Sequence, residues 1–353
     1  MGRRIVTADT LIATTGRLVA DGKGLLAADE SNGTCDKRLA EFDIPQTSES
    51  RRSWRALLFT TPDLATSISG VIVYDETIRQ ASDDGTAFVE ILNHAGMLCG
   101  IKVDSGTTDL AGHQGEKITE GLDGLGARLR DYFRMGARFA KWRAVFSALD
   151  GRPSRACIAA NAQSLARYAA LCQENGLVPI VEPELLMAGA HGLADCAAIT
   201  EEILLDVFHH LAAAGIQLES MLLKPNMVLP GESCAVQDPA DRVASATLRV
   251  LSHTVPAAVG GIAFLSGGQS ARLATERLDA INRLADRPDA RAPWPLTFSF
   301  GRALQQPALA LWRGQAANRS AAQSALHHRA QCNRAVRLGN YSEAMETCAR
   351  ASI

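Results

Sequence analysis

Residues 138–184 read RFAKWRAVFSALDGRPSRACIAANAQSLARYAALCQENGLVPIVEPE, and this stretch has the pattern of a strand, a helix and a second strand. Its two ends, 138–143 and 177–184, are short apolar runs that close on charged side chains. Between them, residues 155–175 carry apolar side chains at helical spacing and stop at Gly176, a residue typical of helix C-termini. A strand followed by a helix and another strand forms two parallel members of a sheet.

The same alternation continues in both directions along the chain. Eight short apolar segments end in a polar residue: 24–29, 70–75, 99–104, 138–143, 177–184, 220–226, 260–268 and 295–302. Their starts lie 29 to 46 residues apart, which is enough for a strand, a turn and a crossover helix. Eight such units predict an α/β fold of the (β/α)8 TIM-barrel type. An open doubly wound sheet is the alternative, which the lack of a G-x-G-x-x-G motif after any strand weakens.

The two ends of the chain complete this plan. We expect a helical lead before the first strand and a long Ala-rich C-terminal helix from Arg302 to about Leu338. Residues 339–353 then form a polar C-terminal tail. No linker-like or low-complexity stretch divides residues 1–353, so we expect a single barrel domain.

Composition excludes several classes of protein. The 36 Lys and Arg residues balance 38 Asp and Glu residues, and no long basic stretch interleaves with aromatics, which argues against nucleic-acid binding. No apolar run is long enough to cross a bilayer, and the N-terminus lacks a continuous apolar signal region. Eight cysteines without a C-x-x-C pair are typical of reduced thiols. We therefore expect a cytoplasmic protein that does not bind a membrane.

Lysine is scarce in this chain, and three lysines occupy predicted strands. Only six of the 36 basic residues are lysines, and Lys102, Lys141 and Lys224 lie inside apolar strand-like segments. An amine can lose its proton and attack a carbonyl, which a guanidinium cannot do. Lys224 is our candidate nucleophile, although a single lysine at a strand end more often pairs with a carboxylate or extends to solvent. Three lysines at matched positions favour a catalytic site at the C-terminal mouth of the barrel.

Carboxylates and glycines accompany these lysines. Glu182 and Glu184 share one face of a predicted strand, as expected for a pair that transfers protons, although a solvated loop pair is the alternative. A Gly-Gly pair in residues 264–270 precedes a predicted helix, and Gly301 with Arg302 follows the last strand. The N–H groups of such a loop and an adjacent arginine can bind phosphate. We expect no catalytic metal, because the eight histidines show no ligand spacing.

Taken together, these segments resemble the class I (Schiff-base) fructose-bisphosphate aldolases. The resemblance spans nearly the whole chain and rests on LLAADESNGT, KRL, GVIVYDET, GIKVDSG, GLDGL, FAKWR, VEPELL, LLKPNMVLPG, FLSGGQS and LTFSFGRALQ, in this order. It implies a lyase of glycolysis and gluconeogenesis that needs no metal or other cofactor. Such an enzyme reversibly splits fructose 1,6-bisphosphate into dihydroxyacetone phosphate and glyceraldehyde 3-phosphate.

The resemblance also implies a role for each catalytic position. Lys224 forms the Schiff base with the ketose carbonyl, and Lys141 supplies the neighbouring ammonium. Glu182 shuttles protons during dehydration of the carbinolamine. Glu184 and Asp29 assist and handle the proton of the C4 hydroxyl while the C3–C4 bond breaks. The iminium takes up the electrons of that bond, so the carbanion becomes a neutral enamine.

Two further sets of residues are expected at the ends of the substrate. The set for the C1 phosphate is Ser266, Gly267, Gly301 and Arg302, with Gly268 of the same loop as a further binding residue. The set that faces the C6 phosphate and the substrate hydroxyls is Ser31, Thr34, Arg38, Lys102 and Arg143.

The chain also departs from the family it resembles. Phe300 stands where Tyr is common, Ser105 stands where Lys is common, and the chain does not end in Tyr. A preference for another phosphorylated ketose, such as fructose 1-phosphate or sedoheptulose 1,7-bisphosphate, is therefore the alternative function. A non-catalytic scaffold that binds phosphosugars is a third possibility, and the resemblance implies a homotetramer.

Overall fold

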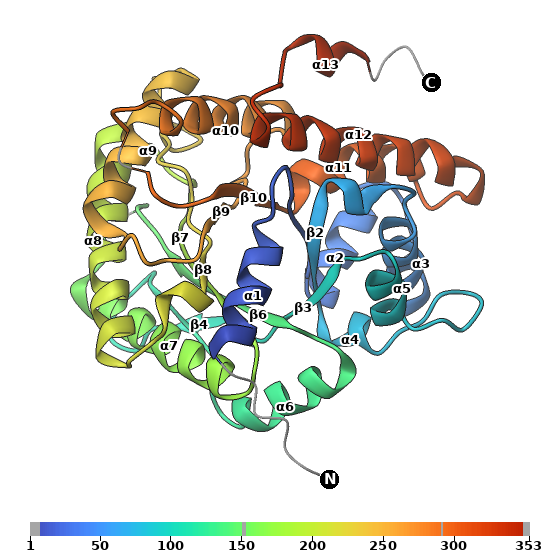
Figure 1. Ribbon diagram of the computed structural model, residues 1–353, viewed down its shortest axis with the longest axis horizontal. Helices are drawn as coiled ribbons and strands as arrows, with labels where there is room; N and C mark the ends of the chain where they lie inside the picture. The colour runs from blue at the N-terminus through green and yellow to red at the C-terminus, as the bar shows by residue number, and fades with distance from the viewer. Residues whose placement is uncertain (1–7, 150–152, 291, 349–353) are drawn as a thin grey trace.

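Eight parallel strands close into a barrel that is surrounded by helices (Figure 1). This computed structural model describes residues 8–149, 153–290 and 292–348. Around the barrel the strands follow the order β1, β10, β9, β8, β7, β6, β3 and β2, and each adjacent pair is parallel. The barrel strands are β1 (Gly24–Ala28), β2 (Ile68–Val73), β3 (Leu98–Lys102), β6 (Phe139–Phe146), β7 (Val178–Leu185), β8 (Leu222–Leu223), β9 (Ile262–Phe264) and β10 (Leu296–Phe300).

Each of the eight predicted apolar segments overlaps one strand of this barrel, so the TIM-barrel prediction is confirmed and the open sheet is excluded. A small antiparallel hairpin between β3 and the next helix was not predicted from the sequence. Its strands, β4 (Thr107–Asp109) and β5 (Lys117–Thr119), have three residues each and are mostly exposed. Strands this short carry no measurable period of hydrophobicity.

Helices cover the outside of the barrel, and one of them closes its N-terminal end. They are α1 (Ala8–Leu18), α2 (Asn32–Ala40), α3 (Ser48–Phe59), α4 (Asp75–Ile78), α5 (Phe88–His94), α6 (Leu125–Met135), α7 (Arg155–Glu174), α8 (Leu193–Ala213), α9 (Ala240–Thr254), α10 (Ala271–Ala285), α11 (Arg302–Trp312), α12 (Arg319–Arg337) and α13 (Ala344–Cys348). The described part of the chain also contains the short 3-10 helices η1 (Leu64–Thr66), η2 (Leu218–Ser220) and η3 (Ala316–Asn318). No helix in the described ranges is both long and apolar enough to span a membrane.

The predicted long C-terminal helix is two helices, and this part of the prediction is wrong. Helix α11 ends where Arg313 and Gly314 adopt left-handed backbone conformations, with φ of 46° and 69°. A left-handed residue cannot continue a right-handed helix. After this break, α12 folds back and packs against α11 (Figure 1).

The beginning of the predicted polar tail is folded onto the protein. Tyr341 is buried, and its hydroxyl donates a hydrogen bond to Glu346 of α13. The other carboxylate oxygen of Glu346 pairs with the buried Arg329 of α12. Residues 349–353 of this tail lie outside the described residues, as do residues 1–7 at the N-terminus.

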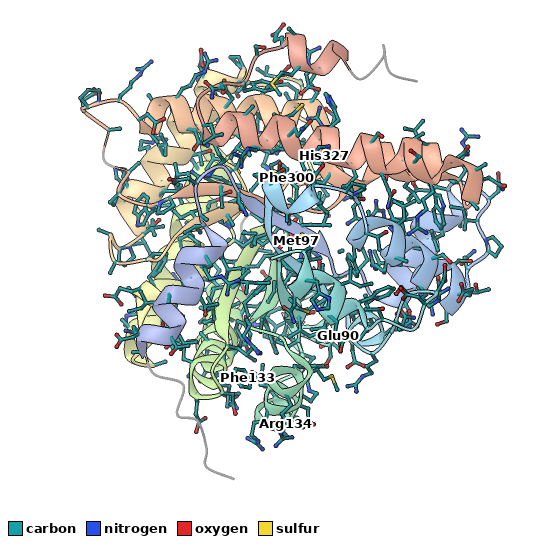
Figure 2. The ribbon with its side chains drawn as sticks, turned by 45° about the vertical axis from the view of Figure 1, so that its right-hand side comes forward. Glu90, Met97, Phe133, Arg134, Phe300 and His327 are labelled. Atoms are coloured by element: carbon teal, nitrogen blue, oxygen red, sulfur yellow. The ribbon has the colours of Figure 1, made fainter. Side chains whose placement is uncertain are left out.

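An apolar layer fills the barrel interior, and α1, which is the predicted helical lead, closes the N-terminal end of the barrel. Leu11 and Leu18 of α1 pack in one cluster with the side chain of Phe139 from β6. Figure 2 shows Met97 and Phe300, both buried, among the central elements, whereas Arg134 extends from the outer end of α6. The N-terminal half of the barrel is therefore a packed core, which leaves the C-terminal mouth for a site.

The ring of Phe139 fits only because the neighbouring strand carries a glycine. A β-carbon at Gly100 of β3 would lie 2.1 Å from Cε2 of Phe139. We predict that Gly100→Ala lowers the free energy of unfolding by about 1–3 kcal/mol, because a well-packed core must shift to admit a methyl group. Urea unfolding of the full chain measures this effect.

Gly126→Ala in α6 is the matched control. Its β-carbon would lie 3.7 Å from the nearest atoms, in a helix where alanine is favoured over glycine. We expect this variant to be as stable as the parent chain or more so. Equal stability of the Gly100 and Gly126 variants would contradict the packing argument.

Candidate active site

The charged residues predicted at the strand ends meet at the C-terminal mouth of the barrel. Strand register explains their proximity, because Lys102 of β3 lies beside Lys141 of β6, and Arg143 of β6 lies beside Glu182 of β7. Asp29 and Lys224 come directly after β1 and β8. Side chains two residues apart on one strand share a face, so the barrel brings alternate residues of neighbouring strands together.

Glu182 bridges two buried lysines at the centre of this mouth. One carboxylate oxygen of Glu182 lies 2.9 Å from Nζ of Lys224, and the other lies 3.0 Å from Nζ of Lys141. Lys141 also contacts Asp29, at 2.8 Å. All four side chains are at least nine-tenths buried, so two positive and two negative charges balance one another where water cannot screen them.

This cluster fixes the charge state of two of its members. Burial opposes ionisation of Asp29, but the ammonium groups of Lys141 and Lys224 outweigh that effect and lower the pKa of Asp29 to about 2. Burial likewise opposes the charge on Lys141, but Asp29 and Glu182 raise its pKa well above the usual range of a lysine. Asp29 is therefore a carboxylate, and Lys141 an ammonium, at any pH near neutral.

A second layer of ion pairs lies beside the lysine cluster. Glu184 accepts a hydrogen bond from Nε of Arg143, and Lys102 donates hydrogen bonds to the side chain and the main-chain carbonyl of Asp104. Oδ2 of Asp104 accepts a bond from the main-chain N–H of Arg143. Asp104 thus links the end of β3 to β6 and holds the ammonium of Lys102, whereas Glu184 holds the guanidinium of Arg143.

A turn after β9 supplies backbone N–H groups to the same mouth. Gly267 and Gly268 have positive φ values of 54° and 77°, and N–H of Gln269 donates to the carbonyl of Ser266. Positive φ at both central residues with this hydrogen bond is typical of a type I′ turn. Within the described ranges, the N–H groups of both glycines have no protein acceptor. Consecutive free N–H groups of this kind form a concave site for an anion.

A cavity of about 390 Å³ joins these groups into one site. All the predicted site residues line it with the exception of Arg38: Asp29, Ser31, Thr34, Lys102, Lys141, Arg143, Glu182, Glu184, Lys224, Ser266, Gly267, Gly268, Gly301 and Arg302. The exposed Arg302 forms no ion pair with any described residue. Its guanidinium can therefore neutralise a bound anion.

Arg38 does not reach this cavity. It is buried behind the wall, where it pairs with Glu30 and donates hydrogen bonds of 3.2 Å to Gln305 and Gln306. Burial opposes the charge on Glu30, but Arg55 and Arg38 outweigh that effect and lower its pKa. The structure thus assigns Arg38 to the support of a wall residue, because its position on α2 directs it toward α11.

Several lining residues had no predicted role in catalysis or substrate binding, although Asp104 was expected among the polar residues at the strand ends. Glu30, Tyr74, Asp104, Ser105 and Ser299 line the cavity. Asp104 and Glu30 each follow a strand, close to a predicted site residue, so their positions in the sequence could have identified them as site residues. Tyr74 and Ser299 belong to classes of residue that are common in any barrel, and only the fold shows where they lie. Among the departures noted above, Ser105 lines the cavity and Phe300 is fully buried within β10.

The described residues include no group of three or more His, Cys, Asp and Glu side chains placed to hold a metal ion. The site is instead a lysine and carboxylate cluster between groups that suit anions. Such an arrangement can form an imine with a carbonyl compound and can hold negatively charged substituents on either side of it.

Comparisons with known proteins agree with this chemistry. Residues 10–352 match the family described as "Glycolytic: Fructose-bisphosphate aldolase class-I". The chain is 51% identical to "Fructose-bisphosphate aldolase 6, cytosolic" of Arabidopsis thaliana, over 95% of this chain and 92% of that protein. It is 47% identical to "Probable fructose-bisphosphate aldolase class 1" of Xanthomonas axonopodis pv. citri, over 94% of this chain and 98% of that protein.

A solved structure shares the whole architecture. Fructose-bisphosphate aldolase from Plasmodium falciparum, solved in complex with TRAP and a small-molecule inhibitor, superposes with a TM-score of 0.92 at 44% identity. The match covers 96% of this chain and 97% of that one. With the matched family spanning nearly all of its residues, the chain belongs to the class I fructose-bisphosphate aldolases.

Proposed function

We propose that this chain reversibly cleaves fructose 1,6-bisphosphate into dihydroxyacetone phosphate and glyceraldehyde 3-phosphate through an imine at Lys224. Membership of the class I family carries a metal-independent Schiff-base mechanism. The observation that supports Lys224 as the nucleophile is the carboxylate of Glu182, 2.9 Å from its amine inside the cavity. A nucleophile needs such an acceptor within hydrogen-bonding distance.

Imine formation begins with transfer of a proton from Lys224 to Glu182. The neutral amine then attacks the C2 carbonyl and forms a carbinolamine. Glu182 returns its proton to the C2 hydroxyl, which leaves as water and gives the iminium. Lys141 remains charged next to Glu182 and Asp29, so it stabilises the negative charges that appear during these transfers.

Cleavage requires a base for the C4 hydroxyl. Asp29 fits this role, because its lowered pKa keeps it ionised and it lines the cavity beside Lys141. As the C4 hydroxyl loses its proton, the electrons of the C3–C4 bond move to the iminium and form the enamine, and the aldehyde leaves. Glu184 is held by Arg143 and lies on the same face of β7 as Glu182, from where it assists this step.

The two ends of the cavity suit the two phosphates. The free N–H groups of Gly267 and Gly268, with Arg302, support binding of the C1 phosphate. The cavity also offers Lys102 and Arg143, together with the hydroxyls of Ser31 and Thr34, which lie 3.1 Å apart at the start of α2, and these groups support binding of the C6 phosphate. Fructose 1-phosphate and sedoheptulose 1,7-bisphosphate remain alternative substrates, and their turnover relative to fructose 1,6-bisphosphate decides the preference.

A cytoplasmic location and a homotetrameric assembly complete the proposal. Relatives named cytosolic or cytoplasmic, from Arabidopsis thaliana and Pisum sativum, support the location. The tetramer follows from the family resemblance alone, and light scattering of the purified protein tests it.

The first prediction is that sodium borohydride traps dihydroxyacetone phosphate on Lys224 alone, in the presence of EDTA, as located by peptide mass mapping. Lys224→Arg should abolish this adduct and lower kcat on the order of a thousandfold or more, since a guanidinium keeps the charge but forms no imine. Lys117→Arg, on the exposed hairpin strand β5, is the control and should leave both unchanged. An adduct spread over surface lysines would refute the mechanism.

The second prediction separates cleavage from imine formation. Asp29→Asn should lower kcat by about 10²- to 10⁴-fold, because an amide cannot accept the C4 hydroxyl proton. Borohydride should still trap dihydroxyacetone phosphate on Lys224 in this variant. Asp63→Asn, at an exposed left-handed position that asparagine tolerates, is the control and should behave as the parent chain. Full activity of Asp29→Asn would remove Asp29 from the mechanism.

The third prediction concerns stability at acidic pH. The folded pKa of Asp29, about 2, lies below its ordinary value of 3.8, so the stabilisation from its charge is present above pH 4 and is lost as the pH falls toward 2. The difference in unfolding free energy between the parent chain and Asp29→Asn should therefore shrink by about 1 kcal/mol from pH 6 to pH 3. Urea unfolding at both pH values measures it, and a constant difference would contradict the assigned charge state.

A further inference from the structure

Helix α10 begins shortly after the Gly-Gly turn and carries three arginines in very different surroundings. Arg272 and Arg283 are exposed and pair with Glu276 and Asp279 of the same helix. Arg277 is only 4% exposed and forms no ion pair with any residue that the structure describes. Its Nε has no hydrogen-bond partner in that part of the chain. Burial of a guanidinium without a carboxylate partner costs stability, so we expect Arg277 to have a functional role.

A chain of hydrogen bonds connects this buried arginine to the Gly-Gly turn. Nη1 of Arg277 donates to Oε1 of Gln269 at 2.9 Å. The amide nitrogen of the same side chain, Nε2, donates to the carbonyl of Ser266 at 2.8 Å. The main-chain N–H of Gln269 donates to that carbonyl as well, at 3.1 Å. Arg277 therefore holds the Gln269 side chain in the orientation in which its amide donates a second hydrogen bond to the Ser266 carbonyl, in addition to the main-chain bond of the turn.

The closed turn determines where the N–H groups of the cavity point. Gly267 and Gly268 lie between Ser266 and Gln269, and their positive φ values are reachable at low cost only by glycine. Two glycines in sequence are also the most flexible pair that a loop can have, so the bonds to the Ser266 carbonyl must hold their conformation. Without Gln269 in place, the N–H groups lose the common direction that an anion requires.

Charge supports the same arrangement. Glu232 lies beside the turn, where a β-carbon built on Gly268 would be 2.6 Å from its carboxylate oxygen Oε1. A carboxylate at this position repels a phosphate. The buried guanidinium of Arg277 offsets that repulsion, and its field is screened less than that of an exposed arginine.

We propose that Arg277 is a positioning residue for phosphate binding, which acts through Gln269 on the Ser266–Gly267–Gly268 turn and does not touch the substrate. This inference rests on the proposed function, since it assumes that a phosphate of the substrate occupies the turn. On this proposal, binding of the substrate phosphate at the turn depends on a residue outside the cavity. The carbonyl chemistry at Lys224 is independent of it.

The test compares two ligands that differ only in the phosphate. Borohydride trapping on Lys224 is measured against the concentration of dihydroxyacetone phosphate and of dihydroxyacetone, in the parent chain and in Arg277→Met. The half-saturating concentration of dihydroxyacetone phosphate should rise about tenfold in the variant, as expected for loss of a hydrogen bond to a charged group. That of dihydroxyacetone should change less than about twofold, and inorganic phosphate should compete about tenfold more weakly.

Arg272→Met is the matched control, with the same substitution at an exposed arginine of the same helix. It should leave unchanged the half-saturating concentrations of both ligands and the strength of competition by inorganic phosphate. The thermal midpoint of Arg277→Met should equal or exceed that of the parent chain, because an apolar side chain of similar length replaces an unpaired buried charge. A purely structural arginine would give a lower midpoint and an equal change for both ligands.

Gln269→Met breaks the same chain from the turn and keeps the test independent of how Arg277→Met folds. It should raise the half-saturating concentration of dihydroxyacetone phosphate about as much as Arg277→Met does. The variant that combines Gln269→Met with Arg277→Met should show no larger rise than the more affected single variant. Additive losses, or unchanged binding of dihydroxyacetone phosphate in either single variant, would overturn the inference. Absence of any Lys224 adduct in the parent chain would instead refute the proposed function.

Discussion

The carboxylate of Glu182, placed between two buried ammonium groups, is the interaction on which the site depends. Neither Lys141 nor Lys224 can be buried as a lone charge, and Glu182 cannot be buried without them. Asp29 adds the fourth charge and brings the cluster to neutrality. A cluster that is neutral as a whole can be buried in a low-dielectric interior, and its amines lie within 3.0 Å of a carboxylate, a distance that permits proton transfer.

The barrel is what makes this cluster possible. The four charged residues lie on four different strands or strand ends, far apart in the chain, and parallel register alone places them at one mouth. The opposite end is closed by α1 and filled by Phe139, which needs the missing side chain of Gly100. The packed apolar half of the barrel thus supports the charged half, where the short distances that proton transfer requires are found.

Support for the site extends one layer outward from the cavity. Arg38 and Arg55 hold Glu30 at one wall, and Arg277 holds Gln269 at another. In both places a buried arginine acts on a residue that lines or shapes the cavity, whereas the exposed arginines of α10 pair with nearby carboxylates. Two walls of the cavity are therefore supported from behind by buried guanidinium groups.

The sequence by itself determined the barrel, its eight strands and most of the charged residues that line the cavity. Apolar runs that end in charged side chains identify both the strands and the mouth, because the C-terminal ends of parallel strands must share one edge. It did not determine the break at Arg313, the β4–β5 hairpin or the place of Arg38, since local pattern contains no information on left-handed residues, three-residue strands or the direction of a side chain on α2. Only the tertiary structure showed that Glu182 joins two lysines and that Arg277 is buried without a carboxylate, because burial and pairing arise from packing between distant segments.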